Sequence, residues 1–524
     1  MNDMKSTEKE KAVAASVSVK EMKYNTPESV WCECAGDFTL PDYMPEIAKM
    51  LSCTPRIIPS GKYIGSERAE FSGCVVYSVI YAGDDGLPFY TTLTGDYEYT
   101  APLGAAASSP HVEIYDEPTI ESVSIRASGP RKITARARIC AVPHILYEDI
   151  KNPPEPYDDV SENYQKLTER VREMEHRHFE SGEFTVEESF KFDASPDAEP
   201  VGCEGNACIS ETVMVAGNIR IRGEVECRVL YYDIVGGRKK LLSTKEKLRF
   251  EREIPLGALA DVTGVRAYPR VISTGMSLSD SGDILLEITI NVCGEYTVNS
   301  EKELLCDIYS CAHTCDVNYE KSSYRREVLC KNMNLSYHAQ KDLQLDGDGC
   351  EVAVSYASVR VGEVNVADGV VSVSGEISVD CLISYTEEDR VEYSPVSIPV
   401  PFRCEAPVSS MADRYDVSVV ADVSGVRTRV EKDSISADAE LYLALFIGGE
   451  DSMRTVESVT LGEEKVAAHR DSVCVYYPDK NETLWSVAKK YKTPTDVLAR
   501  NNSILASAPD SELSLDGVTS LIIV

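Results

Sequence analysis

Three cysteines and one histidine stand close together near the middle of the chain and could hold a metal ion. They are Cys306, Cys311, His313 and Cys315. Thiolate and imidazole ligands of this kind can close a tetrahedral zinc site, and alternate residues of an extended segment would place Cys311, His313 and Cys315 on one side. The spacing is not that of a Cys-x-x-Cys zinc knuckle. We therefore expect a structural junction without metal, and a zinc site is the alternative.

Signatures of catalysis are missing from the rest of the sequence. It contains no nucleophile elbow, no glycine-rich phosphate loop and no His-Glu-x-x-His helix. The seven histidines are scattered, and among 86 acidic side chains no carboxylate pair stands out as a general acid and base. The sequence therefore predicts a protein that is not an enzyme and needs no cofactor.

Three stretches of the chain repeat one strand pattern, and they set its organisation. They run over residues 73–81, 223–231 and 375–385, and each begins with glycine and closes with tyrosine. With the tyrosines in register, alternate positions form one apolar face in each copy: Val75, Tyr77, Val79; Val225, Cys227, Val229; Val379, Cys381, Ile383. Alternation of this kind predicts a half-buried strand. A spacing of about 150 residues indicates a repeated domain rather than a solenoid.

The chain then divides into six parts. We expect a mainly β protein in which three β-sandwich-like repeats cover residues 26–150, 181–315 and 316–468. A flexible segment, 1–25, precedes them. Residues 151–180 have another character, because apolar side chains recur there every three or four positions among charges, which predicts a linking helix between repeats. The helical stripe consists of Tyr164, Leu167, Val171 and Met174.

The last fifty residues form a separate pattern. A strand ends at Tyr477, a helix runs over 483–491, a second helix begins with Thr493 as N-cap and Pro494 as its first residue, and a strand closes the chain at 517–524. Residues 471–524 are therefore predicted to be a small β-α-α-β domain. Its helix surface is locally basic, which suits an acidic protein partner and equally suits solubility.

Charge and cysteine content limit the class of protein further. The net charge of −33 argues against nucleic acid and anionic membranes, because phosphate binding needs clustered lysine and arginine. The first residues lack the apolar region of a secretion signal, and no apolar run is long enough to span a membrane. We expect a protein that stays in the cytoplasm, with its 17 cysteines reduced and acting mainly as small core residues.

The C-terminal domain resembles a LysM domain. The strand ending in tyrosine, the helix Thr-Leu-Trp-Ser-Val-Ala-Lys-Lys-Tyr, the helix Asp-Val-Leu-Ala-Arg-Asn-Asn and the final Leu-Ile-Ile carry the resemblance. It implies that two loops lie side by side and form a shallow partner-binding groove: Asn481, Glu482, Thr483, Leu484, Trp485, Lys489, Asn501, Asn502, Ser503 and Ile504. Asn481-Glu482 stands where carbohydrate-binding members often carry Gly-Asp, which weakens the case for sugar binding.

The body resembles the SPOCS-domain repeats of spore-coat morphogenetic proteins of endospore-forming Firmicutes. The Gly-x-Val strands that end in tyrosine and the segment Asp307-Ile-Tyr-Ser310 carry this resemblance. Three repeats followed by one LysM domain is the layout of the SpoIVA-interacting (SipL-like) family of clostridia. The resemblance implies a non-enzymatic scaffold in the mother-cell cytoplasm, at the forespore surface, with other coat proteins and chiefly a SpoIVA-like coat ATPase as partners. Self-association of the repeats is a further option, and a peptidoglycan- or cortex-binding protein is the alternative function.

Overall fold

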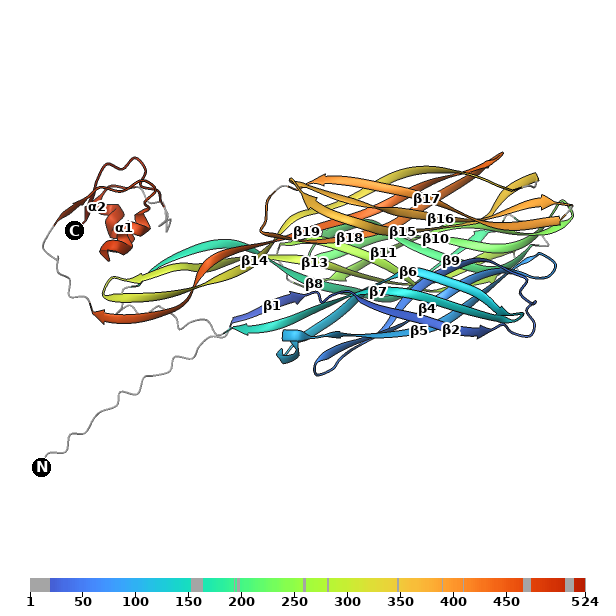
Figure 1. Ribbon diagram of the computed structural model, residues 1–524, viewed down its shortest axis with the longest axis horizontal. Helices are drawn as coiled ribbons and strands as arrows, with labels where there is room; N and C mark the ends of the chain where they lie inside the picture. The colour runs from blue at the N-terminus through green and yellow to red at the C-terminus, as the bar shows by residue number, and fades with distance from the viewer. Residues whose placement is uncertain are drawn as a thin grey trace, which may run out of the picture.

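Long antiparallel strands make up nearly all of the regular structure in the computed structural model, as expected for a mainly β chain (Figure 1). The structure describes residues 19–151, 164–464 (apart from 193, 196–197, 258–260, 280–281, 346–347, 389 and 409), 473–504 and 513–523. Most strands run along the long axis of the molecule, and the two α-helices lie at one end.

Each repeat folds into two sheets by the same path. In the second and third repeats the first strand pairs with the last, which also pairs with the fifth, and we call this the return sheet; the second, third and fourth strands form a meander sheet. In the first repeat two consecutive strands take the place of the first strand, and the rest of the path is the same. The return sheets are β1 (Val19–Asn25), β2 (Val30–Thr39), β7 (Lys132–Lys151) and β6 (Val112–Gly129); β8 (Tyr164–Lys191), β13 (Asp283–Ser310) and β12 (Val262–Leu278); and β14 (His313–Asp342), β19 (Ser434–Glu464) and β18 (Arg414–Glu431). The meander sheets are β3 (Lys49–Ile64), β4 (Arg68–Ala82) and β5 (Pro88–Pro102); β9 (Glu199–Val215), β10 (Asn218–Val235) and β11 (Arg238–Pro255); and β15 (Asp348–Ala367), β16 (Val370–Glu387) and β17 (Arg390–Pro407). One short 3-10 helix, η1 (Gly104–Ser108), follows β5.

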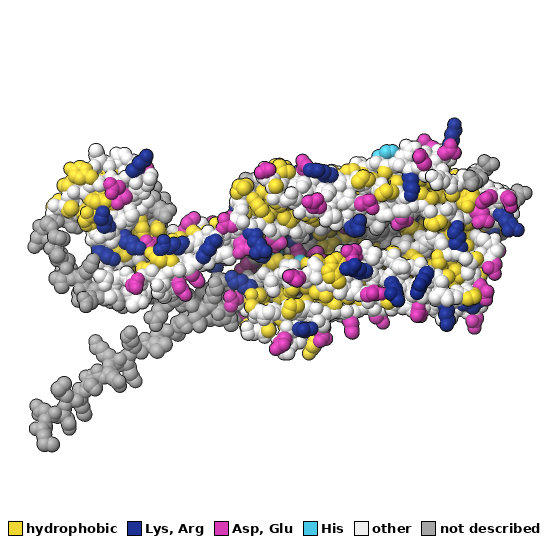
Figure 2. Space-filling view, in the orientation of Figure 1, with side chains coloured by type: hydrophobic (Ala, Val, Ile, Leu, Met, Phe, Trp, Pro, Cys, Tyr) yellow, Lys and Arg dark blue, Asp and Glu magenta, His cyan; other side chains and the backbone are white. Residues whose placement is uncertain are grey.

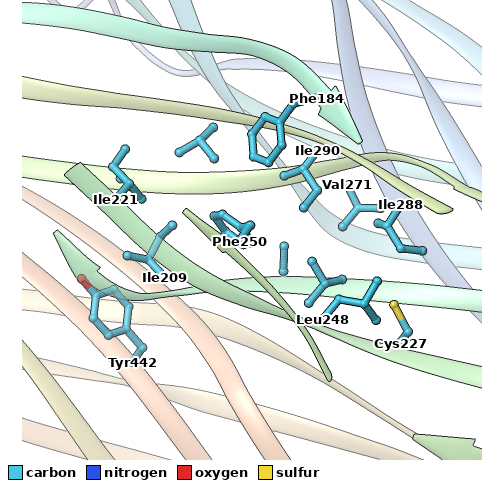
Figure 3. Close-up of a cluster of buried hydrophobic side chains, with 14 of the residues drawn as sticks. Phe184, Ile209, Ile221, Cys227, Leu248, Phe250, Val271, Ile288, Ile290 and Tyr442 are labelled. Atoms are coloured by element: carbon cyan, nitrogen blue, oxygen red, sulfur yellow. The ribbon is translucent and has the colours of Figure 1, made fainter. Parts of the chain in front are cut away.

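The predicted inner faces of the three copied strands are buried, which confirms the alternation. These strands are the central strands β4, β10 and β16 of the meander sheets, and their inner side chains are at most 3% exposed. They pack against the central strand of the return sheet in each repeat. Figure 3 shows the core of the second repeat, where Cys227 and Leu248 of the meander sheet face Ile288 and Ile290 of β13.

The register between the copies follows the glycines rather than the tyrosines. A Cβ atom on Gly73, Gly223 or Gly375 would lie within 2.3–2.5 Å of a carbonyl oxygen on the preceding strand or of an aromatic ring on the next. Each glycine therefore marks the same close approach of three strands. Ile383 is consequently the counterpart of Tyr81, and the alignment through the closing tyrosines was two residues out in the third copy. The inner face survived that error because a shift of two keeps every side chain on its side.

The three meander sheets meet one another along a common line in the body. Each is in contact with the other two, and one apolar cluster takes side chains from all three. The central strand of each meander sheet contributes one equivalent residue to this cluster. Each of the three is at most 1% exposed: Ile80, Leu230 and Leu382. The part of each meander sheet's second face that carries these residues is thus buried between repeats.

The expected linking helix at 151–180 is wrong for the residues that the structure describes; 152–163 lie outside them. Residues 164–180 belong to β8, which pairs with β13 from Tyr164 to Lys191 and is the first strand of the second repeat. Helical spacing of apolar residues is a weak signal, and pairing with a distant strand overrode it. The charges instead pair across strands, as in Arg170–Glu303 at 2.9 Å and Lys302–Glu173 at 3.2 Å.

The expectation of a loose N-terminal segment is also wrong in part. Residues 1–18 lie outside the described chain, but Val19–Asn25 form β1, which pairs with β7 beside β2. Strands β1 and β2 together occupy the place that the long first strands β8 and β14 take in the other repeats. The backbone groups of β7 in this stretch gain hydrogen-bond partners, which is why a polar segment is ordered here.

Two pairs of strands extend beyond the sandwiches and form what we call the arm: residues 164–175 with 299–310, and 313–324 with 451–464. At its end lies the C-terminal domain (Figure 1). It contains β20 (Cys474–Tyr476), α1 (Leu484–Tyr491), α2 (Thr495–Asn501) and β21 (Leu521–Ile523), with β20 paired to β21. The predicted β-α-α-β order is therefore present.

Candidate partner-binding site

The C-terminal domain shares its core with the arm. Tyr309, near the end of β13, is fully buried among the apolar residues of α1, α2 and β21. Its ring meets the Trp485 ring edge-on at 4.9 Å between centroids, and its hydroxyl donates to the Thr493 carbonyl at 2.7 Å. A tyrosine inserted in this way joins two modules through one hydrophobic core. The C-terminal domain therefore packs directly against the arm.

A half-buried carboxylate fixes the same contact between the domain and the arm. Asp307 accepts hydrogen bonds from Trp485 Nε1 at 2.7 Å and from Lys489 Nζ at 2.6 Å and 2.7 Å. The Tyr319 hydroxyl, from β14, donates to it at 2.7 Å. Burial opposes ionisation of Asp307, but these donors outweigh it and hold its pKa below the ordinary value. One carboxylate thus links the domain to both strand pairs of the arm.

The local sequence sets helix α1 in the orientation that this contact needs. Thr483 caps the helix: its side chain accepts from the Ser486 amide, and the Ser486 hydroxyl accepts from the Thr483 amide. Lys492 ends the helix in a left-handed conformation with φ 58°. Trp485 and Lys489 are four residues apart, so both point from one side of the helix towards Asp307.

The predicted groove residues divide into buried, internally bonded and exposed groups. Leu484 and Trp485 are buried at 1% and 5%, and Lys489 is bound to Asp307. Glu482 accepts from the Tyr476 hydroxyl, and Asn502 bonds both backbone groups of Ile522. Ile504 is half-buried in the domain core and Thr483 is the helix cap. Asn481, Asn501 and Ser503 are exposed.

The two loops expected to form one groove are each tied to the C-terminal segment. Asn481 donates its amide to Asp516, and Thr483 forms a bridge with Ser514, whereas Asn502 holds Ile522 in β21. The hydrogen bonds of these predicted residues therefore hold the domain together, and the most apolar of them face the arm.

The C-terminal domain also carries an exposed apolar face. Val475 lies in β20 and pairs with Ile522 of β21, and Val473 and Tyr477 flank β20 at alternate positions. They are 66%, 53%, 70% and 44% exposed. Figure 2 shows hydrophobic side chains gathered on the surface of this domain. Sequence reasoning identified the strand and missed this face, although three apolar residues at alternate positions were the signal.

The four candidate metal ligands do not share a coordination site in the structure. Cys311 packs against the core of the C-terminal domain, and the Cys315 sulfur accepts from the Ser310 amide at 3.2 Å. Cys306 contacts the carbonyl of Leu304. None of the 17 cysteines, all of which lie within the described residues, forms a disulfide. The junction is a turn between β13 and β14 that helps to form the seat of the domain.

A different group, within the described residues, brings three ligand atoms within 4.8 Å of one another: Glu117, His144 and Glu295. Arg266 donates to Glu295, with both side chains at most 3% exposed, and the Tyr115 hydroxyl donates to the same carboxylate at 2.6 Å. Burial opposes ionisation of Glu295, but Arg266 lowers its pKa to about 2. Since the guanidinium supplies the positive charge, we interpret this group as a buried ion pair of the second repeat that lies beside Glu117 and His144 of the first.

Five aromatic rings stack beside that ion pair. Their order is His178, Tyr115, His144, Tyr24 and His176, with centroids 4.1, 4.7, 5.8 and 4.5 Å apart. The rings come from β8, β6, β7 and β1, so they join the first two repeats. Burial lowers the pKa of His176 to about 3 and that of His178 to about 4. Both imidazoles are therefore neutral in the folded protein at neutral pH.

Within the described residues, no helix is long and apolar enough to cross a membrane. Comparison with known proteins gives no relative from which a function could be transferred: no family model, no curated protein and no solved structure matches this chain.

Proposed function

We propose that this chain is a non-enzymatic scaffold of the spore-coat morphogenetic type, with SPOCS-like repeats and a LysM-like C-terminal domain. In this proposal the domain binds a SpoIVA-like coat ATPase at the forespore surface, and the three repeats provide surfaces for further coat proteins. The observation that carries the proposal is the exposed apolar face of β20 and β21, displayed at the extremity of the molecule.

The seat at Asp307 determines how such a scaffold would work. A domain that shares a core with the arm holds its exposed face in a fixed direction relative to the repeats. Binding to a polymer of the ATPase would then orient every repeat body in the same way. Many copies on one polymer raise the effective concentration for neighbouring contacts, so a modest interface is sufficient.

The test is capture of the full-length chain by a purified SpoIVA-like ATPase. Val475→Asp places a charge in the centre of the apolar face, where the native side chain is 53% exposed, and we expect capture to be lost. The matched control is Ile234→Asp, which changes an apolar side chain that is 56% exposed on the second repeat. Fluorescence of the buried Trp485 reports whether the domain stays folded.

Undiminished capture of Val475→Asp would contradict this assignment of the binding face. Removal of residues 471–524 is a poorer test, because it exposes Tyr309 and leaves Asp307 without two of its donors. Sedimentation of the same full-length proteins with purified peptidoglycan decides the alternative. Pelleting of the wild type with peptidoglycan, but no capture by the ATPase, would replace the coat scaffold with an envelope-binding protein.

A further inference from the structure

A cavity of about 340 Å³ lies where the three meander sheets meet, next to the apolar cluster that joins them. Equivalent positions of the three repeats contribute to its lining. The first strands of the meander sheets contribute the equivalent residues Thr54, Glu204 and Tyr356, which pair with Ser78, Arg228 and Asp380. The repeat thus brings three different side chains, a hydroxyl, a carboxylate and a phenol, to one place. No single repeat could build this cavity.

Two arginines that line the cavity each bury a donor without a hydrogen bond. Arg228 is 8% exposed, and its nearest carboxylate oxygens, on Glu204 and Glu226, are 3.6 Å and 3.8 Å away. The Nε atoms of Arg228 and Arg56 are buried without a hydrogen-bond partner among the described residues. Buried polar groups are normally satisfied by protein, water or ligand, so this set indicates an occupant.

The two arginines of the cavity indicate which chemical class of ligand it could bind. Arg56 comes from the first repeat and Arg228 from the second, and the Arg228 guanidinium also lies over the Tyr356 ring at 4.4 Å. Arginine keeps its charge when buried and offers a planar fork of donors that matches carboxylate and phosphate oxygens. Burial raises the pKa of the neighbouring Glu204 carboxyl, and the charge of Arg228 opposes that rise.

The cavity is also accessible. It shares Arg56, Asn206 and Asp422 with an adjoining groove of about 610 Å³, which Trp31 also lines. Asn206 is exposed, although its amide donates to the Val423 carbonyl at 3.1 Å. A volume of this size is within the range of small-molecule sites, roughly 300–1,000 Å³.

We propose that this cavity is a binding site for a small organic oxyanion, a carboxylate or a phosphate ester, whose oxygens lie between Arg56 and Arg228. The rings of Tyr90 and Tyr356 enclose its carbon skeleton. Such a ligand contacts all three repeats, so its binding stabilises their association. The site is independent of the apolar face on the C-terminal domain, and either assignment can fail without the other.

Calorimetric titration of the full-length chain with citrate and with glycerol 3-phosphate tests the proposal, with chloride of equal ionic strength as the reference. We expect one of them to bind at one per chain and to raise the unfolding temperature. Arg56→Met is expected to weaken binding at least tenfold, and Arg56→Lys, which keeps the charge but not the fork, by less. The control Arg249→Met changes an arginine whose side chain is 85% exposed and should leave binding unchanged.

The two ligands distinguish a carboxylate from a phosphate site. Absence of binding by both would overturn the proposal and leave a water-filled cavity. Equal affinity of the wild type and Arg56→Met would overturn it as well, because the anion would then be bound elsewhere. Arg56 makes no hydrogen bond through Nε to the described protein, so its replacement by methionine is compatible with folding; should that variant not fold, Arg56→Lys carries the same comparison.

Discussion

Acid should destabilise this protein through its stacked histidines, and His176 offers the clearest measurement. Its ring is 5% exposed, lies between Tyr24 and Phe446, and has no hydrogen-bond partner on either nitrogen. Burial lowers its pKa to about 3, whereas an unfolded histidine titrates near 6.5. Between these values the unfolded chain binds the proton and the folded chain does not. Stability is therefore fully present above pH 6.5 and falls as the pH falls towards 3.

The size of the effect follows from the difference in pKa. A pH of 5 lies about 1.5 units below the pKa of the unfolded His176 side chain, and each unit of this difference corresponds to about 1.4 kcal/mol. His176 alone should therefore cost about 2 kcal/mol of unfolding free energy between pH 8 and pH 5. His178, with its pKa lowered to about 4 by burial, acts in the same direction. Asp422 acts oppositely, because burial raises its pKa to about 6 and acid then favours the folded state.

Because these contributions oppose one another, the measurement compares a variant with the wild type. His176→Phe retains a flat ring between Tyr24 and Phe446 and removes the titrating group. Urea unfolding at pH 8 and at pH 5 should show that the variant gains about 2 kcal/mol relative to the wild type as the pH is lowered. The control His338→Phe replaces a histidine whose side chain is 59% exposed and leaves the stack intact, so it should not reproduce the gain of His176→Phe. Equal pH dependence of His176→Phe and the wild type would refute the reasoning.

Three further outcomes are expected. Asp307→Asn removes the charge that holds Lys489, which should weaken the seat of the C-terminal domain by about 1.5–3 kcal/mol; in a Trp31→Phe background the emission of Trp485 should shift to the red, and an unchanged spectrum would show that the apolar contact alone fixes the domain. Gly223→Ala places a Cβ atom 2.3 Å from the Phe250 ring and 2.5 Å from a carbonyl oxygen; overpacking of this kind should lower the unfolding free energy by about 1–3 kcal/mol, whereas Gly425→Ala, whose new atom would meet only a flexible carboxylate at 3.4 Å, should cost much less. Chelation with EDTA should leave thermal unfolding unchanged, and stoichiometric zinc in the purified chain would restore the metal-site alternative at the junction.

The periodicity of apolar residues predicted the structure correctly where a single element buries one face. The inner residues of β4, β10 and β16 were identified from alternation alone, because every second side chain of a strand enters the core. The elements of the C-terminal domain were identified from helix periodicity and strand composition. The same approach failed at Tyr164–Met174, where charges on two faces are compatible with either a helix or a long, partly solvated strand, and only the distant partner β13 selects the strand.

The candidate sites show the same division. The sequence predicted the helix that contains Trp485 and Lys489, but it could not show that these residues meet Asp307, about 180 residues earlier in the chain. It showed Val473 and Val475 as strand residues without showing that their face stays exposed. Arg56, Glu204 and Arg228 carry no motif at all, and they became a candidate site only through the meeting of two repeats.

The amino-acid sequence by itself therefore determined the strand-rich class, the threefold internal repeat, the inner face of each copy and the small terminal domain. Each of these depends on the periodicity of neighbouring residues along the chain. The tertiary structure decided which outer faces are covered, where the terminal domain is seated and which charged groups are buried together. Those outcomes depend on contacts between residues far apart in sequence, whose free energy is gained only when the repeats assemble and exclude water from the surfaces between them.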